Sequence, residues 1–286
     1  MIEHLQIRIH GSGDLPTLVY LPGIHGDWTL VSSFRKAVEG RARFVEFIYP
    51  RTLTWSLAEY AGAVQAALAS NGVRRGWLLA ESFGSQVAWP LVAASPGSDR
   101  PDPIEGSNGT DPAGPSPFRV EGLILAAGFV RHPMAWAVPI VAKWCGNIPG
   151  AWIAMFLVVY ARYARFRHRH APESLEGVDE FIARRTELDR SALIHRLHLI
   201  AGYDPSPVAR GVGVPVHYLA GPLDPLVPWP LVRWWLRRHC PGYRGGKMFW
   251  RADHAVLATT PRPAAERVLD WIREAGGPEV KARANP

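Results

Sequence analysis

Short apolar segments of strand length alternate with longer amphipathic segments along most of this chain, and this alternation constrains the fold more than any other feature. Most of the short segments are apolar at successive positions, which is typical of strands buried on both faces. The longer segments have helical periodicity, and several end on Gly. The pattern predicts a mostly parallel sheet with helices on both faces, an α/β fold. We expect an alternating edge strand at residues 4–10 and further strands at 17–23, 42–50, 74–82, 120–130, 214–221 and 246–252.

Two stretches interrupt this alternation. Residues 96–117 are rich in Gly, Pro, Ser and Asp, which predicts a flexible surface loop. Residues 133–208 contain apolar helices and no good strand, which predicts a helical cap inserted into a core of residues 1–132 and 209–286. Within this insertion, residues 152–163 are apolar nearly all round, so we expect that helix to be buried or to border an apolar cavity.

One of the expected strands ends on polar residues and leads directly into a helix, in the stretch WLLAESFGSQVAWPLV at residues 77–92. Ser82 stands at this turn, with the small residues Ala80 and Gly84 two positions before and after it. This is the layout of a nucleophile elbow, where the turn is so sharp that larger flanking side chains would collide. A helix N-cap is the alternative role for such a serine. Ser95 fits the same spacing but closes a helix, so the strand context selects Ser82.

A serine nucleophile needs a base and an acid that orients the base. His254 follows the last expected strand and is the candidate base, and Asp224 follows the preceding strand in a Pro-rich loop and is the candidate acid. Asp253 is a poor acid for His254, because adjacent residues rarely point their side chains at each other. Asp204, in the segment AGYDPSP, remains the alternative acid.

The same chemistry needs two backbone N–H groups that face the developing oxyanion. The residue after the nucleophile, Phe83, supplies the first. The loop GIHGDW at residues 23–28 follows an early strand, and its glycines let the backbone approach the reacting carbonyl closely. We expect Ile24 to supply the second N–H and His25 to contact the substrate. The alternative is that these glycines only form a tight turn.

Charge and cysteine content narrow the class of partner. The 286 residues carry a net charge of +7, with arginine-rich segments, but no zinc-finger or RNA-binding signature accompanies them, so we expect no nucleic acid. Two cysteines give neither a disulfide framework nor a metal-ligand spacing, so we expect no metal and no cofactor. The chain shows no secretory-signal layout and no apolar stretch long enough to span a membrane, which predicts a cytoplasmic protein. These observations do not exclude binding of the protein to the surface of a lipid membrane.

Five segments, in this order, resemble small bacterial α/β-hydrolases related to serine esterases and acyltransferases: LPGIHG, AESFGS, LILAAGFVRHP, VPVHYLAGPLDPLVP and ADHAVLATTPRPAAE. The resemblance covers the sheet-forming parts, roughly residues 17–132 and 212–275. It implies the α/β-hydrolase fold and a Ser-Asp-His triad, in the chain order that this fold shows, on the residues named above. The chain departs from this family in two places, because relatives often have Asp where His25 stands and Gly where Ala80 stands.

The sequence therefore predicts a serine hydrolase that cleaves carboxylic esters through an acyl-enzyme on Ser82. The expected partner is a small-molecule ester with an apolar acyl group, and we expect Met155 and Phe156 of the apolar helix to line the acyl side of the pocket. An acyltransferase is the first alternative, because the same triad serves both reactions. A binding protein that kept the fold and lost the chemistry is the second.

Overall fold

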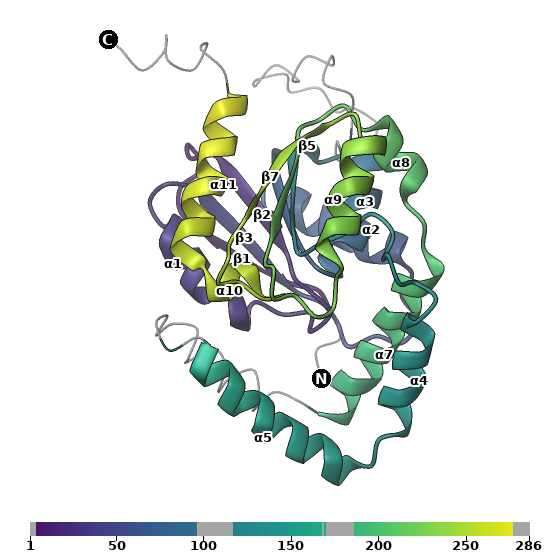
Figure 1. Cartoon of the computed structure of the whole chain (residues 1–286). Coiled ribbons are helices and arrows are strands. Elements are labelled where there is room, and N and C mark those ends of the chain that lie inside the picture. Colours follow the sequence, from purple (N-terminus) through teal and green to yellow (C-terminus); the bar gives the residue numbers. More distant parts are fainter. Residues whose placement is uncertain (1–3, 96–116, 168, 170–185, 277–286) are drawn as a thin grey trace, which may run out of the picture.

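The computed structural model describes residues 4–95, 117–167, 169 and 186–276 (Figure 1). The loop expected at residues 96–117 lies, except for its last residue, outside the described residues. Seven strands form one sheet in the order β1-β3-β2-β4-β5-β6-β7, and all are parallel except β1, which runs antiparallel to β3. The strands are β1 (Gln6–His10), β2 (Thr17–Leu21), β3 (Arg43–Ile48), β4 (Arg75–Glu81), β5 (Arg119–Ala126), β6 (Val216–Ala220) and β7 (Tyr243–Met248).

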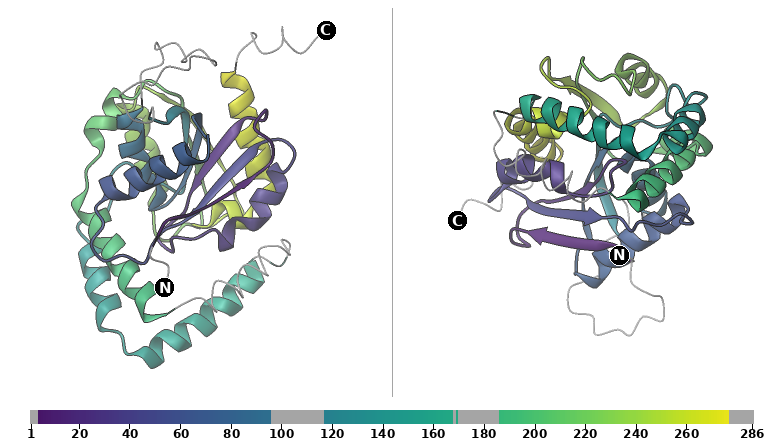
Figure 2. Two further views of the ribbon diagram at one scale, coloured as in Figure 1. Left: turned by 180° about the vertical axis from the view of Figure 1, so that it is seen from behind. Right: turned by 90° about the horizontal axis from the view of Figure 1, so that it is seen from below.

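The apolar character of the strands matches this architecture, because helices cover both faces of the sheet (Figures 1 and 2). In β2, Val19 and Leu21 belong to one hydrophobic cluster and Leu18 and Tyr20 to the other, and all four are fully buried. One face carries α1 (Ser32–Val38), which follows the short helix η1 (Thr29–Val31), and also α10 (Val256–Thr259) and α11 (Pro261–Ala275). The other carries α2 (Leu57–Ser70), α3 (Gly84–Ala94), α8 (Ser206–Gly211) and α9 (Trp229–His239).

The last strand lies earlier in the chain than its sequence predicts. β7 covers residues 243–248 instead of 246–252. The apolar residues that follow it leave the sheet in a turn closed by a hydrogen bond from the Ala252 N–H to the Phe249 carbonyl oxygen (2.8 Å). The polar start of β7 is compatible with its place at the sheet edge, where one side of the strand has no neighbouring strand to pack against.

Between β5 and β6 the described chain is helical, with α4 (Val138–Asn147), α5 (Gly150–Arg167) and α7 (Glu187–Gly202) preceding α8. We call α4, α5 and α7 the insertion helices. They lie beyond the carboxyl ends of the parallel strands, and α5 forms an outer arm at the bottom of Figure 1. The Arg190 guanidinium of α7 donates to the carbonyl oxygens of Cys145 (2.9 Å) and Gly146 (2.6 Å), which fixes α7 to the otherwise unsatisfied end of α4.

Most described side chains of the apolar helix are exposed, which differs from the expectation that this helix is buried or borders an apolar cavity. Trp152, Met155 and Val159 of α5 are all more than half exposed. The physical reason is the position of α5 outside the two helical layers, so that it approaches the core only near its end, where Ala161 is buried and the Tyr163 hydroxyl donates to Asp253 (2.9 Å). Among the described residues, no helix has the length and apolar character needed to cross a membrane.

Candidate active site

A strained turn separates β4 from α3. Ser82 lies in this turn with a φ of +48°, in the left-handed region that non-glycine residues rarely occupy. Gly84 must lack a side chain, because a Cβ at this position would lie 2.2 Å from the carbonyl oxygen of Leu21 in β2. Ala80, on the other side of the turn, is fully buried. Ser82 therefore has the backbone geometry of a nucleophile elbow and does not merely cap a helix.

A chain of hydrogen bonds connects this serine to the ends of two other strands. The Nε2 atom of His254 lies 2.9 Å from the Ser82 Oγ, and its Nδ1 atom lies 2.9 Å from the Asp224 Oδ2. The other carboxylate oxygen of Asp224 accepts hydrogen bonds from the backbone N–H groups of Leu226 (2.8 Å) and Val227 (2.9 Å). The structure thus brings together the three residues that the sequence predicts as nucleophile, base and acid.

The electrostatic surroundings of His254 favour its protonated form. Burial alone would lower the pKa of the imidazole, but the hydrogen bond and the charge of Asp224 outweigh burial, and the charges of Glu81 and Asp253 act in the same direction. The pKa of His254 is therefore raised above its ordinary value. An imidazole with a raised pKa accepts a proton readily, and here the proton would lie beside the carboxylate of Asp224, whose side chain is only 1% exposed.

The loop after β2 lies against the elbow. The Gly26 N–H donates to the Gly23 carbonyl oxygen (2.9 Å), which closes a tight turn around Ile24. The same loop contacts the start of α3, because a Cβ on Gly84 would also approach the Pro22 carbonyl oxygen. This contact places Ile24 and Phe83, the two predicted N–H donors, on adjoining segments.

A buried arginine of α7 holds this loop, and the sequence analysis missed it. Arg196 is 3% exposed, and its guanidinium donates to the carbonyl oxygens of Ile24 (2.9 Å) and Pro50 (3.1 Å). It also lies over the rings of Tyr49 and Tyr60. The chain contains many arginines, and Arg196 lies on a helix whose hydrophobic periodicity is weak. No sequence pattern therefore distinguishes Arg196 from an arginine that faces solvent.

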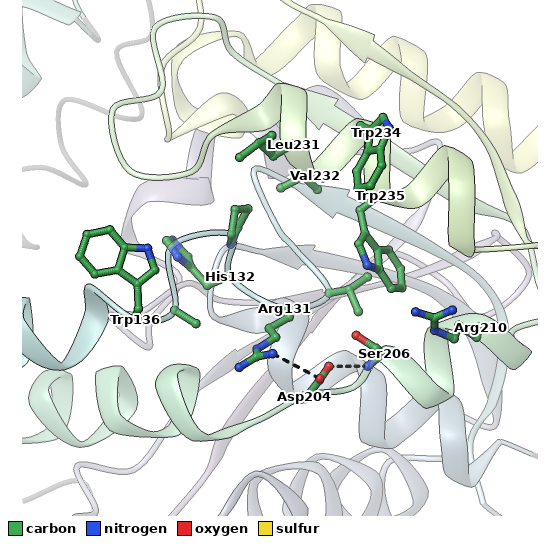
Figure 3. A pocket seen from close by; sticks show the side chains of 13 residues that line it. Arg131, His132, Trp136, Asp204, Ser206, Arg210, Leu231, Val232, Trp234 and Trp235 are labelled. Carbon is green, nitrogen blue, oxygen red and sulfur yellow. Dashed lines mark hydrogen bonds and ion pairs between the residues drawn. The ribbon is translucent and has the colours of Figure 1, made fainter.

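The alternative acid lies in a different place. A groove of about 630 Å³ is lined by side chains from three segments, residues 130–136, 204–210 and 231–235, and Figure 3 shows these side chains. Asp204 faces this groove, where it lies 3.7 Å from the Arg131 guanidinium and accepts a hydrogen bond from the Ser206 N–H (3.0 Å). It is therefore a groove residue and takes no part in the hydrogen bonds of His254.

The remaining candidates have other neighbours. Ser95 is at the far end of α3, and its Oγ accepts a hydrogen bond from the Val120 N–H (2.9 Å). Asp253 accepts from Tyr163 and from the Ala255 N–H (2.9 Å), and it is not the hydrogen-bond partner of the His254 ring. His25 lies 3.0 Å from the Asp27 carbonyl oxygen in the loop after β2.

The two residues expected to line an acyl pocket lie on α5. The Met155 side chain is 53% exposed, and the side chain of Phe156 lies outside the described part of the structure. The structure therefore places the Met155 side chain at the surface of the insertion helices.

Comparison with known proteins identifies the fold. No protein-family model matches the sequence, and no curated protein is significantly similar to it. Solved structures do match. A hydrolase from Pseudomonas aeruginosa has a TM-score of 0.70 at 16% identity, over 94% of both chains. A thermophilic esterase from Thermogutta terrifontis has a TM-score of 0.68 at 17% identity, over 95% of this chain and 93% of the esterase. An enol-lactonase from Burkholderia xenovorans has a TM-score of 0.68 at 17% identity, over 94% of this chain and 96% of the lactonase.

The protein therefore has the α/β-hydrolase fold, as the sequence predicts. At these identities the likeness establishes the architecture and leaves the chemistry to be argued from the site itself.

The elbow makes a direct prediction about stability. Gly84→Ala forces a Cβ against the backbone of β2 and should destabilise the protein by about 2–3 kcal/mol in urea unfolding. Gly62→Ala is the matched control, because a Cβ at this exposed position of α2 meets no atom within 4 Å and should add about 1 kcal/mol of helix stability. A Gly84→Ala protein as stable as the wild type would show that the elbow is less tightly packed than described.

Proposed function

We propose that this protein is a serine hydrolase that cleaves carboxylic esters, with Ser82 as nucleophile, His254 as general base and Asp224 as the acid that orients the base. The observation that carries the proposal is the continuous line of hydrogen bonds from Asp224 through His254 to a serine on a strained elbow. Each member follows the carboxyl end of a different strand. This is the arrangement by which a weakly acidic hydroxyl is activated for attack.

In the first half of the reaction, His254 Nε2 takes the Ser82 proton while Ser82 Oγ forms a bond to the ester carbonyl carbon. The carbonyl oxygen becomes an oxyanion, and the N–H groups of Ile24 and Phe83 are proposed to bind it. Asp224 stabilises the imidazolium and keeps the Nδ1 proton in place. The imidazolium then protonates the leaving alcohol oxygen as its bond to carbon breaks, which leaves the acyl group on Ser82.

In the second half, water replaces the alcohol. His254 takes a proton from water as the water oxygen attacks the acyl carbon, and the second tetrahedral intermediate uses the same two N–H groups. Its collapse breaks the bond to Ser82 Oγ, which recovers a proton from His254, and releases the carboxylic acid. Atoms and charges balance with ester and water alone, so the proposed cycle needs no cofactor.

Two further observations support an ester as the substrate. The solved structures of the same fold include proteins described as esterases and one described as an enol-lactonase, whose substrate is a cyclic ester. The proposed nucleophile is a serine whose hydroxyl is hydrogen-bonded to a histidine, and the histidine is hydrogen-bonded to a carboxylate, which is an arrangement suited to acyl transfer. We assign residues 133–208 as the cap of this enzyme, because the insertion helices lie beyond the carboxyl ends of the strands.

Removing the nucleophile tests the assignment. Ser82→Ala should lower kcat for short nitrophenyl esters at least about a thousandfold and abolish labelling by a fluorophosphonate probe, because it removes the hydroxyl that lies 2.9 Å from the Nε2 atom of the proposed base. Ser95→Ala is the matched control and should change kcat less than about twofold, since Ser95 is at the other end of α3. Retention of activity in Ser82→Ala, or its loss in Ser95→Ala, would contradict the proposal.

The proposed role of His254 as general base predicts that kcat/KM depends on pH. His254 must be neutral to accept the Ser82 proton, so kcat/KM should fall as pH drops through its pKa, with a midpoint above the ordinary value of 6.5 because that pKa is raised. Asp224→Asn removes the charge and the hydrogen bond that raise the pKa. It should lower kcat by about four orders of magnitude and move the residual midpoint to lower pH.

Asp204→Asn is the control for the acid, because it makes the same chemical change in the groove of Figure 3. It should leave both kcat and the midpoint as in the wild type. A larger loss in Asp204→Asn than in Asp224→Asn would reverse the assignment of the acid.

Arg196 is proposed as a positioning residue for the loop that carries Ile24. Arg196→Met removes the bonds to the Ile24 and Pro50 carbonyl oxygens, and misplacement of the loop should lower kcat about tenfold to a hundredfold. The acid-side midpoint should stay unchanged, because the surroundings of His254 are untouched. The control is Arg190→Met on the same helix, whose guanidinium holds α4, and its kcat should remain within about twofold of wild type in folded protein. Equal effects of the two variants, or a shifted midpoint in Arg196→Met, would indicate a general loss of structure.

A further inference from the structure

The insertion helices expose large apolar side chains that a soluble helix normally buries. Each residue of one set is at least half exposed, and we call this set the cap face: Trp136, Ile140, Trp144, Trp152, Met155, Val159 and Phe166. So many large exposed apolar side chains on neighbouring helices are uncommon on soluble proteins, where large apolar patches mark sites of interaction with a protein or a membrane.

The spacing of the cap-face residues shows that the exposure is systematic. Along α5 they recur at intervals of three, four and seven residues, so they share one side of the helix, and the buried Ala161 lies on the opposite side. Tyr163 lies on the same side as this stripe and reaches Asp253, and Val158, which is 57% exposed, lies beside the stripe. On α4, Ile140 and Trp144 are four residues apart and exposed, whereas Ala142 is buried, so α4 has an inner face toward the protein and an apolar outer face.

Other exposed apolar residues lie at the same end of the molecule. Among the described residues, every exposed large apolar side chain outside α9 lies in the segment from Trp136 to Phe166 or in a loop at the carboxyl end of a strand. These loop residues are Leu53 after β3, Leu223 and Leu226 after β6, and Trp250 after β7. The carboxyl ends of parallel strands meet at one edge, so these side chains are on the end that also holds Ser82, His254 and Asp224.

The segment that carries the cap face has charged residues of one sign only. Residues 122–172 contain no Asp or Glu and six basic residues, Arg131, Lys143, Arg162, Arg165, Arg167 and Arg169. On α5 the exposed Arg162 and Arg165 lie beside the apolar stripe, and Arg169, just beyond the end of the helix, is exposed as well. Two copies of the chain joined through this face would bring like charges together, which disfavours a dimer. An apolar face rich in tryptophan and bordered by arginine suits a lipid surface that carries negative charge.

We propose that the cap face docks the protein onto membranes that contain anionic lipid, with the tryptophans among the acyl chains and headgroups and the arginines against lipid phosphates. The docked end is also the end that carries the triad, since Tyr163 of α5 contacts Asp253, the neighbour of His254. The docking goes beyond the proposed hydrolysis and does not depend on Ser82.

Sedimentation of the whole chain with lipid vesicles tests this proposal. The protein should bind vesicles in which about a third of the lipid is phosphatidylglycerol, bind phosphatidylcholine vesicles much more weakly, and lose affinity as salt is raised. Ser82→Ala should bind as wild type does, so a failure of the proposed chemistry would leave this result unchanged. Equal binding to both kinds of vesicle, or to neither, would overturn the proposal.

Charge variants locate the docking surface. Each basic residue at an anionic surface strengthens binding about fivefold, so Arg162→Glu with Arg165→Glu should weaken it at least about 25-fold. Arg237→Glu with Arg238→Glu makes the same change of charge on α9, where both side chains are exposed, and should have a much smaller effect. Equal losses in the two double variants would show a non-specific effect of net charge and contradict the assigned face.

A pair of tryptophan variants separates insertion from charge attraction. Trp152→Ser should weaken vesicle binding at least about fivefold, whereas Trp234→Ser, which removes an equally exposed tryptophan from α9, should leave it unchanged. Both should keep the wild-type unfolding temperature because the side chains are exposed. If light scattering showed a dimer that Trp152→Ser dissociates, without binding to vesicles, the face would belong to a second copy and the proposal would be wrong.

Discussion

The close contact between the start of α3 and the end of β2 is the constraint on which the rest of the site depends. Only a hydrogen atom fits between Gly84 and the Leu21 carbonyl oxygen, so the chain can turn sharply after β4. The Ser82 N–H also donates to the Ala126 carbonyl oxygen at the end of β5 (3.1 Å). Held by both neighbouring strands, the turn keeps Ser82 in a backbone conformation that a free chain would avoid. The same contact brings the loop around Ile24 next to Phe83.

Three carboxylates act on His254, and their hydrogen bonds distinguish their roles. Asp224 bonds directly to the imidazole, and two backbone N–H groups hold its second oxygen. Glu81 accepts a hydrogen bond from Tyr20, and Asp253 accepts from Tyr163, so each has its own donor. Glu81 and Asp253 therefore reach the imidazole only through their charge, whereas Asp224 also fixes its orientation and tautomer. Orientation requires a carboxylate on a separate loop, which the chain neighbour Asp253 is unsuited to provide.

The sequence predicts those parts of the structure whose residue pattern follows from burial. Strands such as β2 are apolar at nearly every position because helices cover both faces of the sheet. The sequence alone therefore predicts these strands. The sequence predicts that Ser82, Asp224 and His254 lie close together for a related reason. Polar residues that follow the carboxyl ends of parallel strands gather at one edge of the sheet.

Arg196 and α5 could not be predicted in the same way. The role of Arg196 depends on carbonyl oxygens more than 140 residues away in the chain, which no local pattern records. For α5, the apolar composition predicts that the helix packs against another apolar surface, but composition does not identify that surface. The predictions for α5, that it is buried or borders an apolar cavity and that Met155 lines an acyl pocket, assumed that the protein itself covers the helix, whereas Met155 is 53% exposed.

Two side chains of the insertion helices form hydrogen bonds with residues next to the proposed active site. Arg196 of α7 holds the loop that carries one proposed oxyanion donor, and Tyr163 of α5 holds the carboxylate beside His254. α4 connects with α7 through Arg190, so α4, which carries part of the cap face, is fixed to the helix that holds the loop. Two of these links therefore end beside the proposed active site, because Arg196 bonds the loop that carries Ile24 and Tyr163 bonds the chain neighbour of His254. The Arg190 link reaches the site only indirectly, because it joins α4 to the helix that carries Arg196.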